Sequence, residues 1–166
     1  QELVKFARKH NMLVTFDEIQ GGFGRPGKMF VYEHYDVEPD LLCLGKGMSG
    51  SLPLSAVIGR RKILDLPDVG SMSSTHSANP LCCAAALANL KEILSRKLVK
   101  AAERKGKILC RGLLALQKKY PKYISYVLGK GMVASILVVD PKTGKPGSLI
   151  ASRICEKAMR KGLLMV

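Results

Sequence analysis

The 166-residue sequence contains no run of about 18 apolar residues, the length that a membrane-spanning helix needs. It also lacks a secretory signal pattern, because Gln1-Glu2-Leu3 leads directly into a helix-like segment. These absences set the membrane and secreted classes aside. The chain does not begin with methionine, and we therefore expect it to be a piece of a longer protein.

Metal-ligand patterns are absent as well. No two cysteines have the C-x-x-C spacing, and the three histidines form no H-E-x-x-H or similar set, so we expect no metal site. An odd number of cysteines without a disulfide framework is typical of reduced thiols in the cytoplasm, packed as small buried side chains. The five cysteines are Cys43, Cys82, Cys83, Cys110 and Cys155.

Aromatic residues make up only 5% of the chain, although its formal net charge is +14. The charge is uneven, because residues 1–90 are neutral, residues 91–122 carry +9 and residues 123–166 carry +5. Nucleic-acid surfaces combine positive charges with aromatic side chains, and residues 96–119 contain no aromatic residue. We expect no nucleic-acid partner and a solvated helix face, with a basic non-enzymatic binding module as the alternative. The basic residues at helical spacing are Lys97, Lys100, Arg104, Lys107 and Arg111.

Hydrophobic patterns and turn signals predict the course of the chain. Asn79 and Pro80 are expected to cap and begin a helix. The segment 21–27 contains the G-x-G-x-x-G spacing, but Pro26 interrupts it, so we expect a glycine-rich turn rather than a dinucleotide site. Strands and helices alternate through the first 95 residues, which is typical of a parallel α/β layer, and the change of charge there indicates a second, smaller unit. The expected helices cover residues 2–9, 80–94, 96–119 and 148–161, and the expected strands cover 12–16, 40–44, 54–58 and 133–139.

Two chemically complementary side chains follow the first two expected strands. Asp17 comes after the strand 12–16, and Lys46 follows the strand 40–44 between two glycines. Parallel strands end at the same edge of a sheet, where open α/β sheets bind ligands. An anion and an amine there would suit pyridoxal phosphate (PLP), whose ring nitrogen needs the anion and whose aldehyde reacts with the amine, and solvated loop residues are the alternative. Glu18 is the weaker candidate for the anion, because neighbours on an extended segment point to opposite sides.

Ordered motifs surround these two residues. They are LVTFDEIQ at 13–20, GFGR at 22–25, EPDL at 38–41, GKGM at 45–48 and STHSANP at 74–80. Together they resemble the class-III aminotransferases, which are PLP enzymes of fold type I. The resemblance covers residues 1–95 and continues more weakly through VLGKGM at 127–132, where Leu128 replaces an arginine that the family often has.

The resemblance implies a role for each matching residue. Asp17 would pair with the ring nitrogen, Ile19 would pack on the ring face, and Gln20 would hydrogen-bond the ring hydroxyl. Lys46 would form the Schiff base and then move the substrate's α-proton, so that Lys46 and Asp17 are the catalytic residues. Thr75 would reach the phosphate of a cofactor bound mostly by a second subunit, which implies a homodimer or a dimer of dimers.

The resemblance also implies the fold, the activity and the division of the chain. Residues 1–95 would be the C-terminal half of the large PLP-binding α/β domain with its mainly parallel sheet, residues 96–122 a connecting helix, and residues 123–166 the start of the small α+β domain. The enzyme would transfer an amino group from an amino acid or amine to a 2-oxo acid, and a racemase or aminomutase of the same family is the alternative. The family's phosphate turn, ring-stacking aromatic residue and carboxylate-binding arginine would lie before Gln1 or after Val166. We therefore expect the 166-residue chain alone to be inactive.

Overall fold

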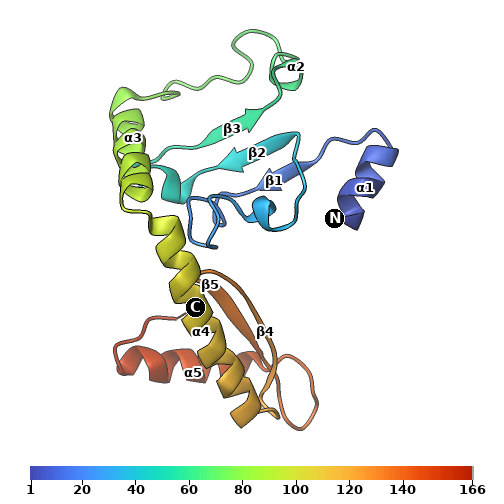
Figure 1. Cartoon of the computed structure of the whole chain (residues 1–166), viewed down its shortest axis with the longest axis vertical. Helices are drawn as coiled ribbons and strands as arrows, with labels where there is room; N and C mark the ends of the chain where they lie inside the picture. The colour runs from blue at the N-terminus through green and yellow to red at the C-terminus, as the bar shows by residue number, and fades with distance from the viewer. Residues whose placement is uncertain (166) are drawn as a thin grey trace. The chain divides into compact units, whose positions relative to one another are not determined.

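The computed structural model describes residues 1–165, and the chain divides into two compact units, Gln1–Arg104 and a second that begins at Lys105. Figure 1 shows the elements along the chain. The helices are α1 (Glu2–Lys9), α2 (Arg61–Leu64), α3 (Pro80–Ser95), α4 (Leu98–Lys119) and α5 (Ser148–Arg160); the strands are β1 (Thr15–Asp17), β2 (Leu41–Leu44), β3 (Ala56–Gly59), β4 (Ile124–Lys130) and β5 (Val133–Val138), and 3₁₀ turns cover Val31–His34 and Lys46–Met48. No helix within residues 1–165 is long and apolar enough to cross a membrane.

The first unit is built on a three-stranded sheet with β2 in the middle (Figure 1). β1 and β2 are parallel, as predicted, and Asp17 lies beside Cys43. β3 instead runs antiparallel to β2, so the sheet is mixed. The cause is the connection between them: residues 45–55 contain only a 3₁₀ turn, and a parallel return needs a crossover of about a dozen residues, usually an α-helix. The carboxyl ends of β1 and β2 therefore share one edge of the sheet.

Helix α3 contributes to the core of the first unit. It begins as predicted, because the side chain of Asn79 accepts hydrogen bonds from the backbone N–H groups of Leu81 and Cys82 at 3.0 and 3.4 Å, and Pro80 has no N–H to satisfy. Its buried residues pack with those of β2 and of the loops beside it. The buried core residues are Phe23, Leu42, Leu44, Met48, Ala86 and Ile93.

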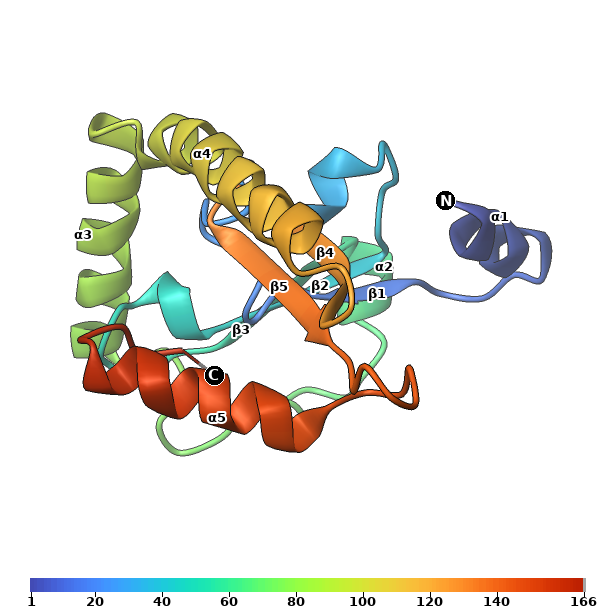
Figure 2. The same ribbon diagram turned by 90° about the horizontal axis from the view of Figure 1, so that it is seen from below.

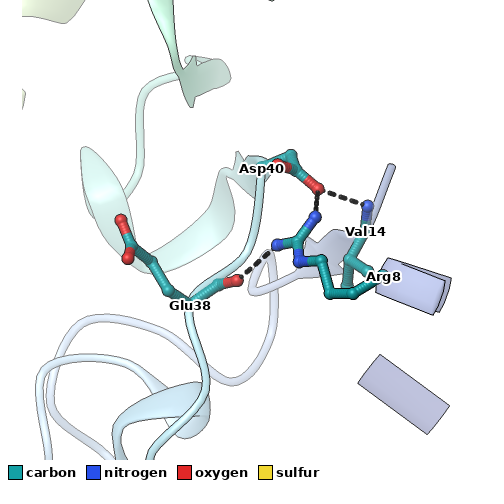
Figure 3. Close-up of polar contacts among 4 residues, drawn as sticks. All are labelled: Arg8, Val14, Glu38 and Asp40. Carbon is teal, nitrogen blue, oxygen red and sulfur yellow. Dashed lines mark hydrogen bonds and ion pairs between the residues drawn. The ribbon is translucent and has the colours of Figure 1, made fainter. Parts of the chain in front are cut away.

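A buried carboxylate ties α1 to the start of β2 (Figure 3). Asp40 is only 4% exposed, and its Oδ2 accepts hydrogen bonds from the Arg8 guanidinium and, at 2.8 Å, from the backbone N–H of Val14. Arg8 also donates to the carbonyl oxygen of Glu38 at 2.9 Å. The Val14 N–H, and after it Arg8, lower the pKa of Asp40 below its ordinary value, because both stabilise the ionised carboxylate.

The lowered pKa of Asp40 predicts an acid-sensitive contribution to stability. The ionised carboxylate stabilises the fold above about pH 4, where an unpaired aspartate titrates, and this contribution is lost as the pH falls through the lower folded-state pKa. Replacing Asp40 by asparagine should lower the free energy of unfolding at pH 7 by about 1–3 kcal/mol. The deficit should shrink as the pH is lowered below about pH 4. Urea unfolding at several pH values measures the difference, and a deficit that stays constant with pH would contradict this role.

The second unit contains an antiparallel hairpin of β4 and β5, with α5 against β5 (Figure 2). Helix α4 comes very close to the hairpin turn at Gly106, where a Cβ would lie 2.1 Å from the carbonyl oxygen of Gly131. No residue with a Cβ fits at that distance without a shift of the backbone. The same helix begins in the first unit, where Val99 packs against the core.

Several boundaries differ from those predicted, each for a local reason. β1 begins at Thr15, where its pairing with β2 starts, and Leu13 is 57% exposed. β4 was not predicted, because its apolar residues do not alternate regularly with polar ones and the strand ends in glycine and lysine. The two compact units divide after Arg104, inside the continuous helix α4.

The cysteines are less buried than predicted. Cys82 is buried and Cys83 is exposed, because successive residues of an α-helix point about 100° apart and cannot both face the core. The other three are half-buried. The five basic residues predicted to form a solvated face at positions 97–111 are all exposed.

Candidate active site

Lys46 begins the 3₁₀ turn that directly follows β2. Its φ is +42°, a left-handed conformation that costs a residue with a side chain about 1–2 kcal/mol. The glycines on either side lie close to other side chains: a Cβ at Gly45 would be 3.3 Å from Ile19, and one at Gly47 would be 3.5 Å from Phe23. Strained backbone of this kind clusters at functional sites, and among the described non-glycine residues with positive φ, Lys46 is the one that lines both of the cavities described next; it is therefore the centre of the candidate site.

The Lys46 side chain meets Gln20 at the carboxyl edge of the sheet. Its Nζ donates a hydrogen bond to Oε1 of Gln20 at 3.1 Å. Lys46 and Ile19 line two neighbouring cavities, of about 660 Å³ and about 240 Å³, and Gln20 and Arg25 complete the wall of the smaller one. The larger volume lies within the range of cofactor and small-molecule sites, about 300–1,000 Å³.

Asp17 and Glu18 point to opposite sides, as predicted. Asp17 ends β1 with an exposed side chain, and its Oδ1 accepts a hydrogen bond from the backbone N–H of Ile19 at 2.9 Å. Glu18 is 1% exposed, and its Oε1 accepts from the backbone N–H of Tyr32 at 2.9 Å, whereas its Oε2 has no hydrogen-bond partner among the described residues. Asp17 is therefore the carboxylate that a ligand at this edge could reach.

The segment before α3 forms another wall of the larger cavity. Ser74, His76 and Ser77 line it, and the hydroxyl oxygens of Ser74 and Ser77 are 3.2 Å apart. Thr75 is exposed but is not part of the lining. This segment leads into the N-terminus of α3, where the Asn79 side chain already accepts hydrogen bonds from the Leu81 and Cys82 N–H groups.

The structure places the five site residues chosen from the sequence in two groups. Lys46, Ile19 and Gln20 come together around the cavities. Asp17 and Thr75 lie outside the lining of both cavities, each next to a residue that lines one: Asp17 bonds to the backbone of Ile19, and Thr75 is flanked by lining residues. Within residues 1–165, no group of histidine, cysteine, aspartate or glutamate side chains is placed to hold a metal ion.

Three further residues at the site were not chosen from the sequence. Arg25 and His76 line the smaller and the larger cavity. Asn89, on α3, donates hydrogen bonds from its Nδ2 to the carbonyl oxygens of Gly47 at 2.7 Å and Met48 at 3.1 Å. The only local signal for Asn89 is that a polar amide interrupts a run of alanine and leucine.

Comparison with known proteins shows a match along the whole chain. The sequence model of the family described as Aminotransferase class-III matches residues 1–166. A probable 4-aminobutyrate aminotransferase of Bacillus subtilis (strain 168) is 38% identical over 167 residues, covering 100% of this chain and 38% of that protein. An acetylornithine aminotransferase of Caldanaerobacter subterraneus subsp. tengcongensis is 39% identical over 169 residues, covering 99% of this chain and 40% of that protein.

A solved structure gives the same result for the fold. It is taurine:2-oxoglutarate aminotransferase from Bifidobacterium kashiwanohense, in complex with PLP and glutamate. The TM-score is 0.90 at 26% sequence identity, over 99% of this chain and 39% of that one. The chain therefore spans 38–40% of the length of these two curated relatives.

Proposed function

Because the chain belongs to the class-III aminotransferase family, we propose that it supplies the lysine-bearing part of the PLP site in an enzyme that transfers an amino group from an amino acid or amine to a 2-oxo acid. The observation that carries the proposal is the strained turn at Lys46, which directs an amine to two cavities at the carboxyl edge of β1 and β2. The names of the relatives support the reaction, and the neighbour that holds PLP supports the cofactor.

The residues around the larger cavity fit PLP. Among the described residues, its lining includes an amine, an imidazole and several hydroxyl groups but no carboxylate, a composition that suits an anionic phosphate ester. When bound, PLP supplies an electron sink for the charge that remains after the substrate's α-proton leaves.

Each residue of this chain then has a distinct task. The Nζ of Lys46 would hold the aldehyde carbon of the cofactor and, once released, would act as the base for the substrate's α-proton. The carboxylate of Asp17 would supply the negative charge that keeps the ring nitrogen protonated. Gln20 orients the Lys46 amine through their 3.1 Å contact, and its amide nitrogen would donate to the ring hydroxyl. The Ile19 side chain would pack on the ring and exclude water from it.

The assembly belongs to the same proposal. Thr75 contacts the phosphate of a cofactor held mostly by a second subunit, in a homodimer or a dimer of dimers; its exposure and its place between the cavity-lining residues Ser74 and His76 support this role. Residues 1–95 belong to the large domain, residues 96–122 are the connecting helix, and residues 123–166 begin the small domain. The enzyme works in the cytoplasm, in keeping with its unpaired cysteines.

The test of this function is an assay of the natural protein that contains this chain. A single enantiomer of each amino donor is incubated with and without 2-oxoglutarate, and glutamate and the new oxo product are measured. Glutamate that forms only in the presence of both substrates supports the proposal. Racemisation of the donor without 2-oxoglutarate, or the lack of an absorbance band from bound PLP after dialysis, would contradict it.

Asp17 should tune the cofactor without itself transferring a proton. Replacing Asp17 by asparagine in the natural protein should leave PLP bound but slow transamination by about 10²-fold or more, because the fixed negative charge at the ring nitrogen is lost. The same change at Asp68, which is exposed and lines neither cavity, is the control. Single-turnover absorbance measurements give the rate, and an unchanged rate for the Asp17 variant would refute the assignment.

The 166-residue chain on its own should bind PLP weakly and show no turnover. Asp17, Gln20 and Lys46 are exposed to water in this chain, so each contact with the cofactor competes with hydration. Titration of the purified chain with PLP, followed by an assay with several donors and 2-oxoglutarate, measures both properties. Tight stoichiometric binding with turnover would show that the residues of this chain suffice.

A further inference from the structure

We propose that Asn89 is a positioning residue, which holds the turn at Lys46 in its strained conformation and so keeps the Lys46 amine at the cofactor cavity; the inference rests on the proposed function of Lys46. Asn89 lies on α3, 42 residues from Gly47 in the sequence, and is half-buried. Among the described residues of α3, Asn89 is the only one whose side chain hydrogen-bonds the turn at Lys46.

The contacts of Asn89 meet a need of the turn. A 3₁₀ turn of three residues leaves its last carbonyl groups without partners inside the turn. Nδ2 of Asn89 donates to two such groups, at 2.7 Å to Gly47 and at 3.1 Å to Met48. The Met48 side chain is buried in the core. The turn is therefore held at two places, by the packing of this side chain and by the hydrogen bonds from Asn89 to its carbonyl oxygens.

The hydrogen bonds from Asn89 matter because the backbone of Lys46 is strained. Residues at positive φ persist only where the surrounding structure holds them, and Lys46, at φ +42°, has a glycine on each side. Glycines restrain their neighbours weakly, because they rotate freely in both directions. Without the two bonds from Asn89, the peptide should relax to negative φ and move Nζ away from Gln20, which it now contacts at 3.1 Å.

The sequence of α3 is in keeping with a role outside the helix. Asn89 stands within residues 84–94, where alanine and leucine predominate. Asparagine is a poor residue for a helix interior, because its amide competes for backbone hydrogen bonds. A positioning role predicts such a residue: it disfavours its own helix, and its side chain hydrogen-bonds another segment of the chain.

The experiment compares three variants of the natural protein. Asn89→Asp keeps the size but removes both N–H donors, Asn89→Ala removes the group, and Asn89→Gln keeps the amide. Ala88→Asp is the control, because it adds the same charge to α3 at the neighbouring position, which is exposed and lines neither cavity. Two readouts are needed. The first is hydrogen exchange, measured without cofactor, at the Met48 backbone amide, which donates to the Gly45 carbonyl oxygen at 3.0 Å. The second is kcat and KM with PLP bound.

Asn89→Asp and Asn89→Ala should speed exchange at Met48 and lower kcat by roughly 10–100-fold, with KM within about 3-fold, as expected when a reacting group is misplaced by about 1 Å. Asn89→Gln should recover most of the rate. If Asn89→Asp does not fold, the comparison of Asn89→Ala with Asn89→Gln tests the inference without it. Unchanged exchange and kcat in the Ala variant, or an equal loss in the Gln variant, overturns the inference. Failure of the unsubstituted protein to transaminate counts against the proposed function instead, because the exchange readout does not depend on activity.

Discussion

Replacing Lys46 by alanine in the natural protein should abolish covalent retention of PLP and lower the transamination rate by about 10³-fold. The reason is that, in the proposed function, one amine would both bond to the aldehyde carbon and carry the α-proton. Borohydride reduction followed by peptide mapping measures the first task, and the pyridoxyl group should be found on Lys46. Loss of activity measures the second.

Two further lysine variants separate the amine from its charge. Lys46→Arg keeps the positive charge but cannot form the bond to the aldehyde, so it should fail almost as completely as Lys46→Ala. Lys62→Ala removes an exposed lysine on α2 that lines neither cavity, and it should keep full activity. A pyridoxyl group on any lysine other than Lys46 would refute the assignment.

Replacing Gly106 by alanine should destabilise the second unit by about 3 kcal/mol or more. The new Cβ would lie 2.1 Å from the carbonyl oxygen of Gly131 and 2.2 Å from its carbonyl carbon. Both atoms belong to the backbone of the hairpin turn, so no side-chain rotation relieves the overlap. Denaturant unfolding followed by circular dichroism measures the loss.

Gly112 offers a control on the same helix. A Cβ at Gly112 would meet no atom within 4 Å. Alanine there should stabilise the helix by about 0.5–1 kcal/mol, because it removes the conformational freedom of glycine from the unfolded chain. The two substitutions are chemically identical, so opposite signs would assign the effect to packing at the hairpin turn. A loss below about 1 kcal/mol at Gly106, within the range of an ordinary substitution, would contradict the close approach.

The parts of the fold that the sequence predicted depend on short stretches of chain. The helix at Glu2–Lys9 and the Asn79 cap depend on residues within one or two turns of each other, and both are confirmed. The antiparallel direction of β3 was not predicted, because it depends on how the connection from β2 packs, which local periodicity does not contain. β4 was missed, because its apolar residues neither alternate regularly with polar ones nor form a long run, and its pairing with β5 is not visible in local sequence.

The site shows the same limit. The motifs around Asp17 and Lys46 brought out the residues that match a family pattern. The strain at Lys46 and the bonds from Asn89 were not predictable, because a backbone angle and a contact across 42 residues leave no local pattern. Arg8 and Asp40 are a second example: their ion pair spans 32 residues and joins two elements that the sequence could only describe separately. The roles of the five site residues stay predictions until the variants are measured.

β1 and β3 are the outer strands of the sheet in the first unit, and among the described residues only β2 has a neighbour on both sides. An outer strand presents backbone N–H and C=O groups that a strand of another chain can pair with. On β3, Val57 is 47% and Ile58 is 54% exposed, and no charged residue lies between Ala56 and Gly59. The isolated 166-residue chain is consequently prone to edge-to-edge aggregation, and cofactor titrations of it belong at low protein concentration, where self-association does not compete with binding.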